Sequence, residues 1–233
     1  MKLYSEFPRY LVAVDCIIFG YDLAEKEIKL LLIKRSFEPA MGKWSLAGGF
    51  VEEKESLNEA ACRILFKLTG LSDVYMEQSF TYGDIGRDPG ARVFSTSYTA
   101  LIKIQDIDKE LKEQNGAHWQ SISRLPDLIF DHRTMVNKAL EELRMQIKIK
   151  PIGFALLPEK FTLVQLQDLY EAIYQRVIDK RNFRKKILSM NILERLDEKE
   201  KETSRKGAYY YTFIRERYET FKKNGFYFNL DVN

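Results

Sequence analysis

Apolar and polar positions along the chain follow two different periods, and together they predict a mixture of strands and helices. Runs of strand length that are rich in apolar and β-branched residues predict strands at 11–20, 28–34, 80–82 and 93–104. Polar or Gly- and Pro-containing stretches predict a turn at 21–27 and loops at 36–49 and 83–90. Apolar residues three and four positions apart predict helices at 56–69 and 134–147, with Gly70 ending the first.

The chain is expected to divide into two domains at Pro151. Proline disfavours a helical conformation in the residue before it, so the second predicted helix must end near residue 150. We therefore expect one domain over residues 1–150, in which strands and helices are mixed, and a second over residues 151–233.

The second domain begins with two short helices that lie close together in the sequence. Thr162 and Gln165 have the spacing of a capping box, which predicts a helix start. Asp179 is expected to cap the next helix, which would extend to Met190. The side chains expected to face inward on this helix are Phe183, Ile187 and Leu188. A charged loop over 197–207 and a strand over 209–213 should follow, so this domain is predicted to be a winged helix-turn-helix.

Composition agrees with a globular protein. The 233 residues are 45% hydrophobic and 30% charged, which is enough apolar content for a core, and disorder is excluded. No apolar run approaches 18 residues, and the N-terminal segment lacks a signal-peptide core. Cys16 and Cys62 both have apolar neighbours and are expected to be buried thiols. We expect a cytoplasmic protein.

Basic residues concentrate in the second domain. Residues 151–233 contain 16 Lys and Arg against 12 Asp and Glu, whereas residues 1–150 contain 21 against 22. The helix after Asp179 presents basic and amide side chains on its polar face, and more cations precede the last strand. This pattern is typical of a recognition helix and a wing that bind double-stranded DNA, although a solvated basic surface would have the same composition. The predicted DNA-binding residues are Lys180, Arg181, Asn182, Arg184, Lys185, Lys201, Arg205 and Lys206.

A motif in the first domain resembles the Nudix box. Gly49, Glu55, Arg63, Gly70 and the apolar Leu71 stand at the spacing of that family's pattern. The resemblance covers about residues 9–148. It implies an α/β/α sandwich with a mixed sheet, so that the whole chain is expected to be an α+β protein. It also implies that Glu55 and Arg63 form an ion pair between the loop and the helix.

The residues that bind the metal in Nudix hydrolases are missing from this box. The family has glutamates where this chain has Ile64, Lys67 and Leu68, and the chemistry needs such carboxylates to hold divalent cations against a pyrophosphate. The two histidines, His118 and His132, are too few for another metal site. We therefore expect no enzyme activity, no metal and no cofactor. A divergent hydrolase that uses Glu52, Glu53 or Glu59 instead is the alternative.

A Nudix-like domain without its carboxylates still provides a pocket. Trp44 is available for stacking or for core packing. Arg87 and Arg92 flank the 83–90 loop, where they would meet an anionic ligand or water. Asp131 and His132 belong to a Phe-Asp-His segment in which Asp131 is more often a helix cap than a ligand. The predicted effector-binding residues are Trp44, Ser45, Gly48, Gly49, Arg87, Arg92 and His132.

The order of the two domains resembles the Nudix-related transcriptional regulators, over almost the whole chain. Some members respond to ADP-ribose and others to arabinose. The resemblance implies a ligand-responsive regulator, expected to be a repressor, that binds a palindromic operator as a homodimer. Because the metal carboxylates are absent, the first expectation for the effector is a pentose such as L-arabinose and the second is ADP-ribose. The alternative functions are a divergent hydrolase of nucleoside diphosphate sugars and, less favoured, an RNA-associated Nudix protein.

Overall fold

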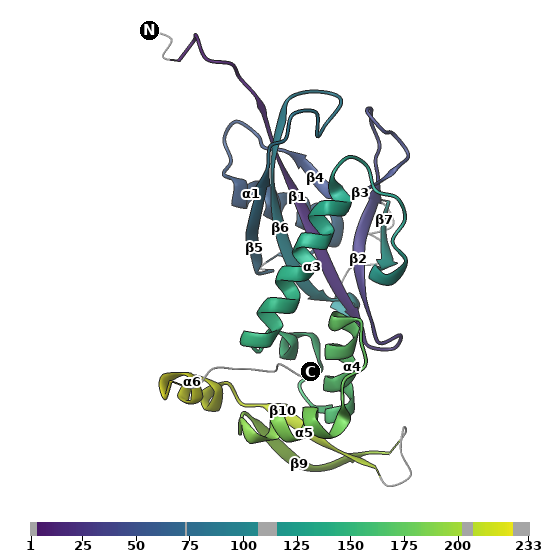
Figure 1. Cartoon of the computed structure of the whole chain (residues 1–233), viewed down its shortest axis with the longest axis vertical. Helices are drawn as coiled ribbons and strands as arrows, with labels where there is room; N and C mark the ends of the chain where they lie inside the picture. Colours follow the sequence, from purple (N-terminus) through teal and green to yellow (C-terminus); the bar gives the residue numbers. More distant parts are fainter. Residues whose placement is uncertain (1–3, 73, 107–115, 202–206, 226–233) are drawn as a thin grey trace. The chain divides into compact units, whose positions relative to one another are not determined.

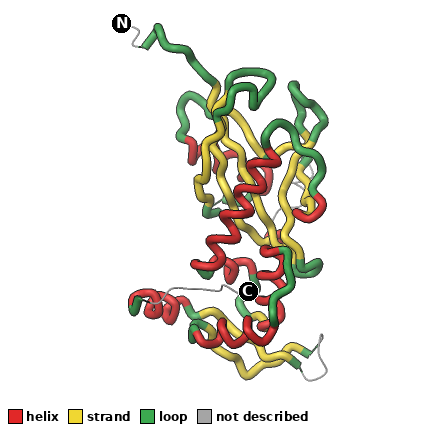
Figure 2. The backbone as a smooth tube through the Cα atoms, viewed as in Figure 1, coloured by secondary structure: helices red, strands yellow, loops and turns green. Residues whose placement is uncertain are grey.

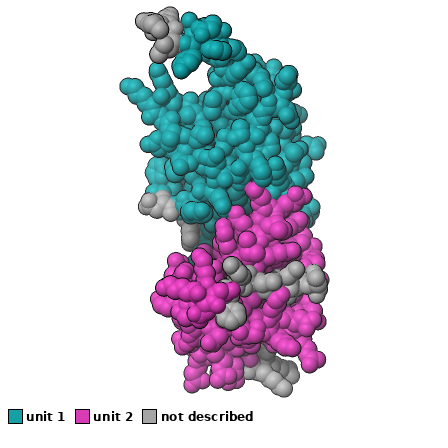
Figure 3. Space-filling model, turned by 60° about the vertical axis from the view of Figure 1, so that its left-hand side comes forward, with its two compact units in different colours: residues 1–20, 29–139 teal, residues 21–28, 140–233 magenta. Residues whose placement is uncertain are grey.

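The computed structural model describes residues 4–72, 74–106, 116–201 and 207–225. It divides into two compact units, which Figure 3 colours separately. Unit 1 comprises residues 1–20 and 29–139, and unit 2 comprises residues 21–28 and 140–233. This division falls within a helix, before the boundary expected at Pro151, and it assigns the tip of the first hairpin to unit 2.

A mixed sheet forms the centre of the first unit. In the described part of the chain it has seven strands, in the order β3-β2-β1-β6-β5, while β4 pairs with β1 and β7 pairs with β2. The strands are β1 (Leu11–Asp22), β2 (Glu27–Lys34), β3 (Trp44–Ser45), β4 (Ala47–Phe50), β5 (Met76–Tyr82), β6 (Val93–Lys103) and β7 (Ala117–Ser121). Short 3-10 turns follow β6 and β7, at Ile104–Asp106 and Ile122–Arg124.

Helices cover both faces of this sheet, which explains why β1 is buried along most of its length. Helix α1 (Leu57–Thr69) shares a core cluster with Val14, Cys16 and Ile18 of β1. Because successive strand side chains point to opposite faces, Asp15 must point toward the other face. The N-terminal part of α3 (His132–Ile149) crosses that face (Figure 1).

The second unit contains a helix pair and a small sheet. Helices α4 (Leu163–Tyr174) and α5 (Lys180–Ser189) pack through Phe183, whose ring lies edge-on to Tyr170 with centroids 5.6 Å apart. Both rings are fully buried. The sheet has the order β8-β10-β9. The remaining elements are the 3-10 turn η3 (Ile152–Leu156), β8 (Phe161–Thr162), β9 (Leu193–Glu200), β10 (Ala208–Phe213) and α6 (Arg215–Lys223).

The predicted helices and their caps are confirmed. Ser56 and Thr162 each form a reciprocal capping box, with Glu59 and Gln165 respectively. Gly70 ends α1 in the left-handed conformation, which glycine adopts without steric cost. Asp179 caps α5 by accepting a hydrogen bond from the backbone N–H of Asn182.

Several sequence predictions are wrong, and Figure 2 shows two of them as strands where loops were expected. The stretch 36–49 contains β3 and most of β4, because its glycines pair with β1. The expected charged loop at 197–207 begins as a strand: β9 extends to Glu200, and its pairing with β10 leaves most of its charged side chains exposed. Leu188 is 44% exposed, since it lies one position beyond the buried stripe of α5, and Cys62 is exposed on α1. Strand β7 and helix α6 were not predicted.

Candidate functional site

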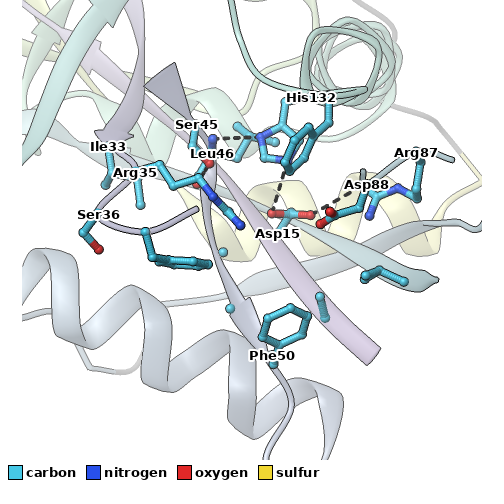
Figure 4. Close-up of a pocket in the computed structure, with 16 residues that line it drawn as sticks. Asp15, Ile33, Arg35, Ser36, Ser45, Leu46, Phe50, Arg87, Asp88 and His132 are labelled. Carbon is cyan, nitrogen blue, oxygen red and sulfur yellow. Dashed lines mark hydrogen bonds and ion pairs between the residues drawn. The ribbon is translucent and has the colours of Figure 1, made fainter. Parts of the chain in front are cut away.

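A pocket lies in unit 1 beside β1, where two glycine-containing loops and the start of α3 converge (Figure 4). Its cavity volume is about 70 Å³. Five of the predicted effector residues line it, namely Ser45, Gly48, Gly49, Arg87 and His132. The other lining residues are Ala13, Asp15, Ile33, Arg35, Ser36, Phe37, Leu46, Phe50, Asp88, Val93 and Phe130.

The base of the pocket is a buried group of charged and polar side chains around Asp15. Ser95 donates a hydrogen bond of 2.6 Å to Oδ2 of Asp15, and Nε2 of His132 lies 3.8 Å from Oδ1. Arg87 donates two hydrogen bonds, of 2.8 and 2.7 Å, to the carboxylate of Asp131. The Asp131 side chain is therefore the ion-pair partner of the buried Arg87. This pair explains the presence of an aspartate directly before α3.

His132 is held as a neutral ring at this base. Burial lowers its pKa, and this effect outweighs the nearby carboxylates of Asp15 and Asp131, which act in the opposite direction. Its Nδ1 accepts a hydrogen bond of 3.1 Å from the backbone N–H of Leu46. The proton of the neutral ring is therefore on Nε2, on the side of Asp15. The pocket thus presents an acceptor carboxylate next to a donor N–H.

Gly48 is required for this arrangement. It lies opposite Asp15 in the antiparallel pairing of β4 with β1. A Cβ atom at this position would collide with Oδ1 of Asp15 and would lie 3.0 Å from the carbonyl oxygen of Val14. Only glycine leaves room for the carboxylate beside the strand.

Arg35 is a pocket residue that the sequence analysis missed. Its guanidinium lies 3.9 Å from the centroid of the Phe37 ring and 5.4 Å from that of Phe130. Its Nε is buried and has no hydrogen-bond partner among the residues that the structure describes. Figure 4 shows the side chain directed into the pocket. The sequence held one signal for this role: Arg35 directly follows the predicted strand and directly precedes the 36–49 stretch that contributes to the pocket.

Trp44 and Arg92 lie outside the lining of this pocket. The Trp44 ring packs edge-on against His118 at 5.4 Å between centroids, and the ammonium of Lys34 lies 5.2 Å from it. Arg92 donates hydrogen bonds to the carbonyl oxygens of Gly83 and Asp84 and so closes the base of the 83–90 loop. The contacts of Trp44 and Arg92 are thus with other parts of the protein and lie outside the pocket.

The box helix α1 retains the expected ion pair. Nε of Arg63 donates a hydrogen bond of 2.9 Å to Glu55, and Nη2 bonds both Glu55 and the carbonyl oxygen of Phe50. This interaction lowers the pKa of Glu55 to about 2. The loop is thereby fixed to the helix.

Two apolar side chains and a lysine occupy the positions where the Nudix pattern has carboxylates. Ile64 and Leu68 belong to the core cluster, and Ile64 Cδ1 would lie 3.2 Å from a Cβ placed on Gly49. Lys67 is exposed. Among the described residues, no group of three or more His, Cys, Asp or Glu is arranged to hold a metal ion.

The exposed face of α5 carries the predicted recognition residues. Lys180, Arg181, Asn182 and Lys185 are exposed, and Arg184 is half-buried. Lys201, directly after β9, is also exposed, whereas Arg205 and Lys206 lie outside the described residues. The helix therefore presents three cations and an amide to solvent, and Arg181 and Lys185 lie on the face opposite Phe183 and Ile187.

A polar network that the sequence analysis missed fixes the turn between α4 and α5. Glu171 accepts hydrogen bonds of 2.9 Å from the Gln167 amide and from the backbone N–H of Ile178. Gln167 also donates to the carbonyl oxygen of Ile178. Gln175 ends α4 in the left-handed conformation. These bonds fix Ile178, in the turn that precedes α5, to the side chains of α4.

Comparison with known proteins agrees with both units. A model of the NUDIX domain matches residues 9–139, and a model of the NrtR DNA-binding winged helix domain matches residues 153–213. No helix in the described ranges is both long and apolar enough to span a bilayer.

Three relatives cover one or both of these regions. The ADPR responsive transcriptional repressor NtrR of Acinetobacter baylyi is 30% identical over 92% of this chain and 86% of its own length. NrtR of Shewanella oneidensis, solved in complex with a 27mer DNA, has a TM-score of 0.76 at 28% identity, covering 94% of this chain and 99% of that one. The NUDIX domain of the same Shewanella protein, solved with ADP ribose, has a TM-score of 0.50 at 31% identity, covering 60% of this chain and 92% of that one. With both domains matched in this order and a curated relative aligned across most of its length, the chain belongs to the NrtR family of ligand-responsive, Nudix-related transcriptional regulators.

Proposed function

We propose that this protein is a repressor whose Nudix-like unit binds ADP-ribose and whose winged helix binds an operator. The observation that carries the proposal is the 30% identity to an ADPR responsive transcriptional repressor over 92% of this chain. That alignment includes both the pocket and the recognition helix, so it supports the two activities in one molecule.

The chemistry of the pocket supports an anionic, hydroxyl-bearing ligand. The unpartnered Nε of Arg35 is a charged donor suited to a phosphate oxygen, and the Asp15 carboxylate is an acceptor suited to a sugar hydroxyl. The cavity of about 70 Å³ would hold one end of ADP-ribose.

The effector expected first from the sequence, a pentose such as L-arabinose, has no support from the relatives described above. Two of them are named for ADP-ribose or solved with it. A neutral pentose would also leave the Arg35 cation without a counter-charge. We therefore place ADP-ribose first and keep the pentose as a ligand to be tested.

The DNA-binding role rests on the exposed cations and amide of α5. Arginine and asparagine side chains on a helix in the major groove read base edges, and lysines contact phosphates. Lys180, Arg181, Asn182 and Lys185 are exposed for this purpose, and Arg184 is half-buried beside them. The protein would bind a palindromic operator as a homodimer, because two-fold symmetric proteins match two-fold symmetric half-sites.

Regulation requires that ADP-ribose bind the DNA-free form more tightly than the operator-bound form. A ligand shifts an equilibrium only by its difference in affinity for the two states. The proposed effect of ADP-ribose is therefore a measurable loss of operator affinity.

Hydrolysis of ADP-ribose is the competing function, and the packing of Ile64 and Leu68 in the core argues against it. Incubation of the protein with ADP-ribose and Mg²⁺, followed by chromatography for AMP and ribose 5-phosphate, tests this directly. Turnover would require the pocket to be reassigned as an active site.

The proposal is tested by fluorescence anisotropy with duplexes from upstream of the protein's own gene and neighbouring operons. We expect salt-dependent binding that ADP-ribose releases and that L-arabinose does not. Substitution of Arg181 and Arg184 by alanine should weaken binding. Release by arabinose alone would reverse the choice of effector, and absence of specific binding to every duplex would refute the repressor.

A further inference from the structure

Helix α4, the first helix of the helix-turn-helix pair, is contacted by two segments that are continuous with the effector pocket. One is the tip of the β1–β2 hairpin at residues 21–28, and the other is the part of α3 after residue 139. Both belong to the same compact unit as α4, and Figure 3 gives this unit one colour. The hairpin strands carry Asp15 and lead directly into Arg35, and α3 begins at His132, so each segment starts or ends among residues that line the pocket.

The hairpin tip is an ordered turn with a charged contact to α4. Oδ1 of Asp22 accepts hydrogen bonds of 3.1 Å from two backbone N–H groups within the turn. Nζ of Lys26 lies 2.9 Å from Oδ2 of Asp168, whose side chain is only 18% exposed. Tyr21 is buried beside this contact: burial raises the pKa of its hydroxyl, and the nearby carboxylates of Asp168 and Asp22 act in the same direction. The tip is therefore joined to α4 by an ion pair next to a buried ring.

Arg144 of α3 holds the C-terminal end of α4. Its Nε donates a hydrogen bond of 3.0 Å to the carbonyl oxygen of Ile173, and its Nη2 donates one of 3.1 Å to Oε1 of Gln175. Ile173 lies in the last turn of α4 and Gln175 is its C-cap. The last carbonyl oxygens of a helix have no partner within the helix, and a cation there complements the helix dipole. Arg144 thus ties α3 to the end of α4 that leads into the turn before α5.

Both connecting segments are firmly built where they pass between the two units. The division of β1 falls directly after Gly20. A Cβ atom on Gly20 would lie 2.6 Å from the Trp119 ring and 2.7 Å from the Ile104 side chain, so this glycine allows close packing beside the strand and is not a free joint. Helix α3 is continuous over 18 residues across the same division. A displacement of β1 or α3 at the pocket would consequently be passed on to α4.

We propose that Lys26 and Arg144 couple the two binding activities, by transmitting effector binding in the pocket to α4 and from there to the recognition helix α5. This inference rests on the proposed function and deepens it by naming the contacts that connect the pocket to the winged helix. Helix α4 packs on α5 through Tyr170 and Phe183. Lys26 and Arg144 do not line the pocket and do not belong to α5. Loss of their contacts should therefore leave each binding site intact and lower the factor by which ADP-ribose weakens operator binding.

The test compares Lys26→Gln, Arg144→Gln and the double variant in the full-length protein, with Lys160→Gln as the matched control. Lys160 forms an ion pair of similar length, 2.8 Å, with Glu198 of β9, which belongs to neither connecting segment. Operator affinity is measured by anisotropy without and with saturating ADP-ribose, and the ratio of the two affinities is the coupling factor. The double variant should lower this factor about two- to thirtyfold, with one as the lower limit, as found for residues that carry coupling between sites. Lys160→Gln should keep the wild-type factor.

Exchange of the two charges distinguishes a coupling role from a general loss of stability. Lys26→Asp alone should lower the coupling factor, and Lys26→Asp combined with Asp168→Lys should restore it, because the ion pair forms again with its charges reversed. Failure of the exchange to restore the factor would overturn the role of this pair.

Calorimetry on the free variants shows where any effect arises. The affinity of each free variant for ADP-ribose should equal that of the wild type, and a loss of this affinity would place the effect in the pocket and overturn the inference. An unchanged coupling factor in the double variant would also overturn the inference, while leaving the repressor proposal intact. A coupling factor of one in the wild type would instead refute the proposed function.

Discussion

Replacement of Arg35 by glutamine is the sharpest test of the pocket. Arg35 is the cation in the lining whose Nε is buried without a hydrogen-bond partner, whereas Arg87 is satisfied by Asp131. A hydrogen bond from a charged donor contributes about 1.5–3 kcal/mol, and about 1.4 kcal/mol is a factor of ten. Arg35→Gln should therefore weaken ADP-ribose binding roughly ten- to hundredfold, as measured by isothermal titration calorimetry.

The same substitution should have little effect on stability. The buried Nε costs about 1–3 kcal/mol when unsatisfied, which offsets the stabilisation of about 0.5–1 kcal/mol expected from each ring contact. The free energy of unfolding in urea should consequently stay within about 1 kcal/mol of the wild-type value. A loss of affinity together with preserved stability would identify Arg35 as a ligand-binding residue.

Lys34→Gln is the matched control, because it removes one positive charge from the neighbouring position. Lys34 lies over Trp44, which does not line the pocket. Its substitution should leave ADP-ribose binding unchanged. Wild-type affinity in Arg35→Gln, or an equal loss in both variants, would refute the assignment of Arg35 to the anionic part of the ligand.

Three further changes test the framework around the two sites. Phe183→Ala should destabilise the winged helix by about 3–5 kcal/mol in urea unfolding, since the ring is fully buried between α4 and α5, and a loss below 1 kcal/mol would contradict this packing. Asp131→Asn should cost about 1–3 kcal/mol because it removes the carboxylate that accepts two hydrogen bonds from the buried Arg87 and leaves Asp15, 3.9 Å away, as the nearest carboxylate, and unchanged thermal unfolding would show that the pair is dispensable. The pKa of Glu55 is lowered to about 2 by Arg63, so its contribution to stability should be complete above about pH 5 and be lost as the pH falls toward 2; Glu55→Gln should flatten this part of the stability profile.

Local signals predicted the helices well. The capping boxes at Ser56 and Thr162, the Gly70 stop and the Asp179 cap each depend on residues within one turn, so spacing alone identifies them. The resemblance of the box motif to the Nudix pattern implied the contact of Glu55 with Arg63, which the structure confirms. Such features require no knowledge of how distant segments pair.

The base of the pocket depends on long-range pairing and could be predicted only in part. Asp15 meets Ser95 and His132 because β1 is next to β6 in the sheet and the start of α3 crosses the same face, although Ser95 and His132 are 80 or more residues away in the sequence. The pairing of Arg87 with Asp131 spans 44 residues. No periodicity reports these contacts, and so Asp15 and Arg35 were absent from the predicted set.

In the wing, formed by β9 and β10, a high content of charged residues made a strand difficult to recognise from the sequence. Residues 193–200 have no β-branched or aromatic side chains, and the charges from Asp197 onward suggested a loop. Pairing with Tyr209–Phe213 satisfies the backbone while the side chains remain at the surface, where charge carries little cost. Acidic and basic residues tend to alternate along this segment, as side chains on the two faces of a strand do, but its highly charged composition favoured the interpretation as a loop.

The central claim is that ADP-ribose and operator DNA each weaken the binding of the other to the protein. Calorimetric titration of ADP-ribose into the free protein and into the protein–operator complex tests it most directly. Linkage requires ADP-ribose to bind the complex more weakly, by the same factor by which ADP-ribose weakens operator binding. We expect that factor to lie between about 5 and 150, the usual range of coupling between two sites. Equal ADP-ribose affinity in the two titrations, or no binding in either, would contradict the account.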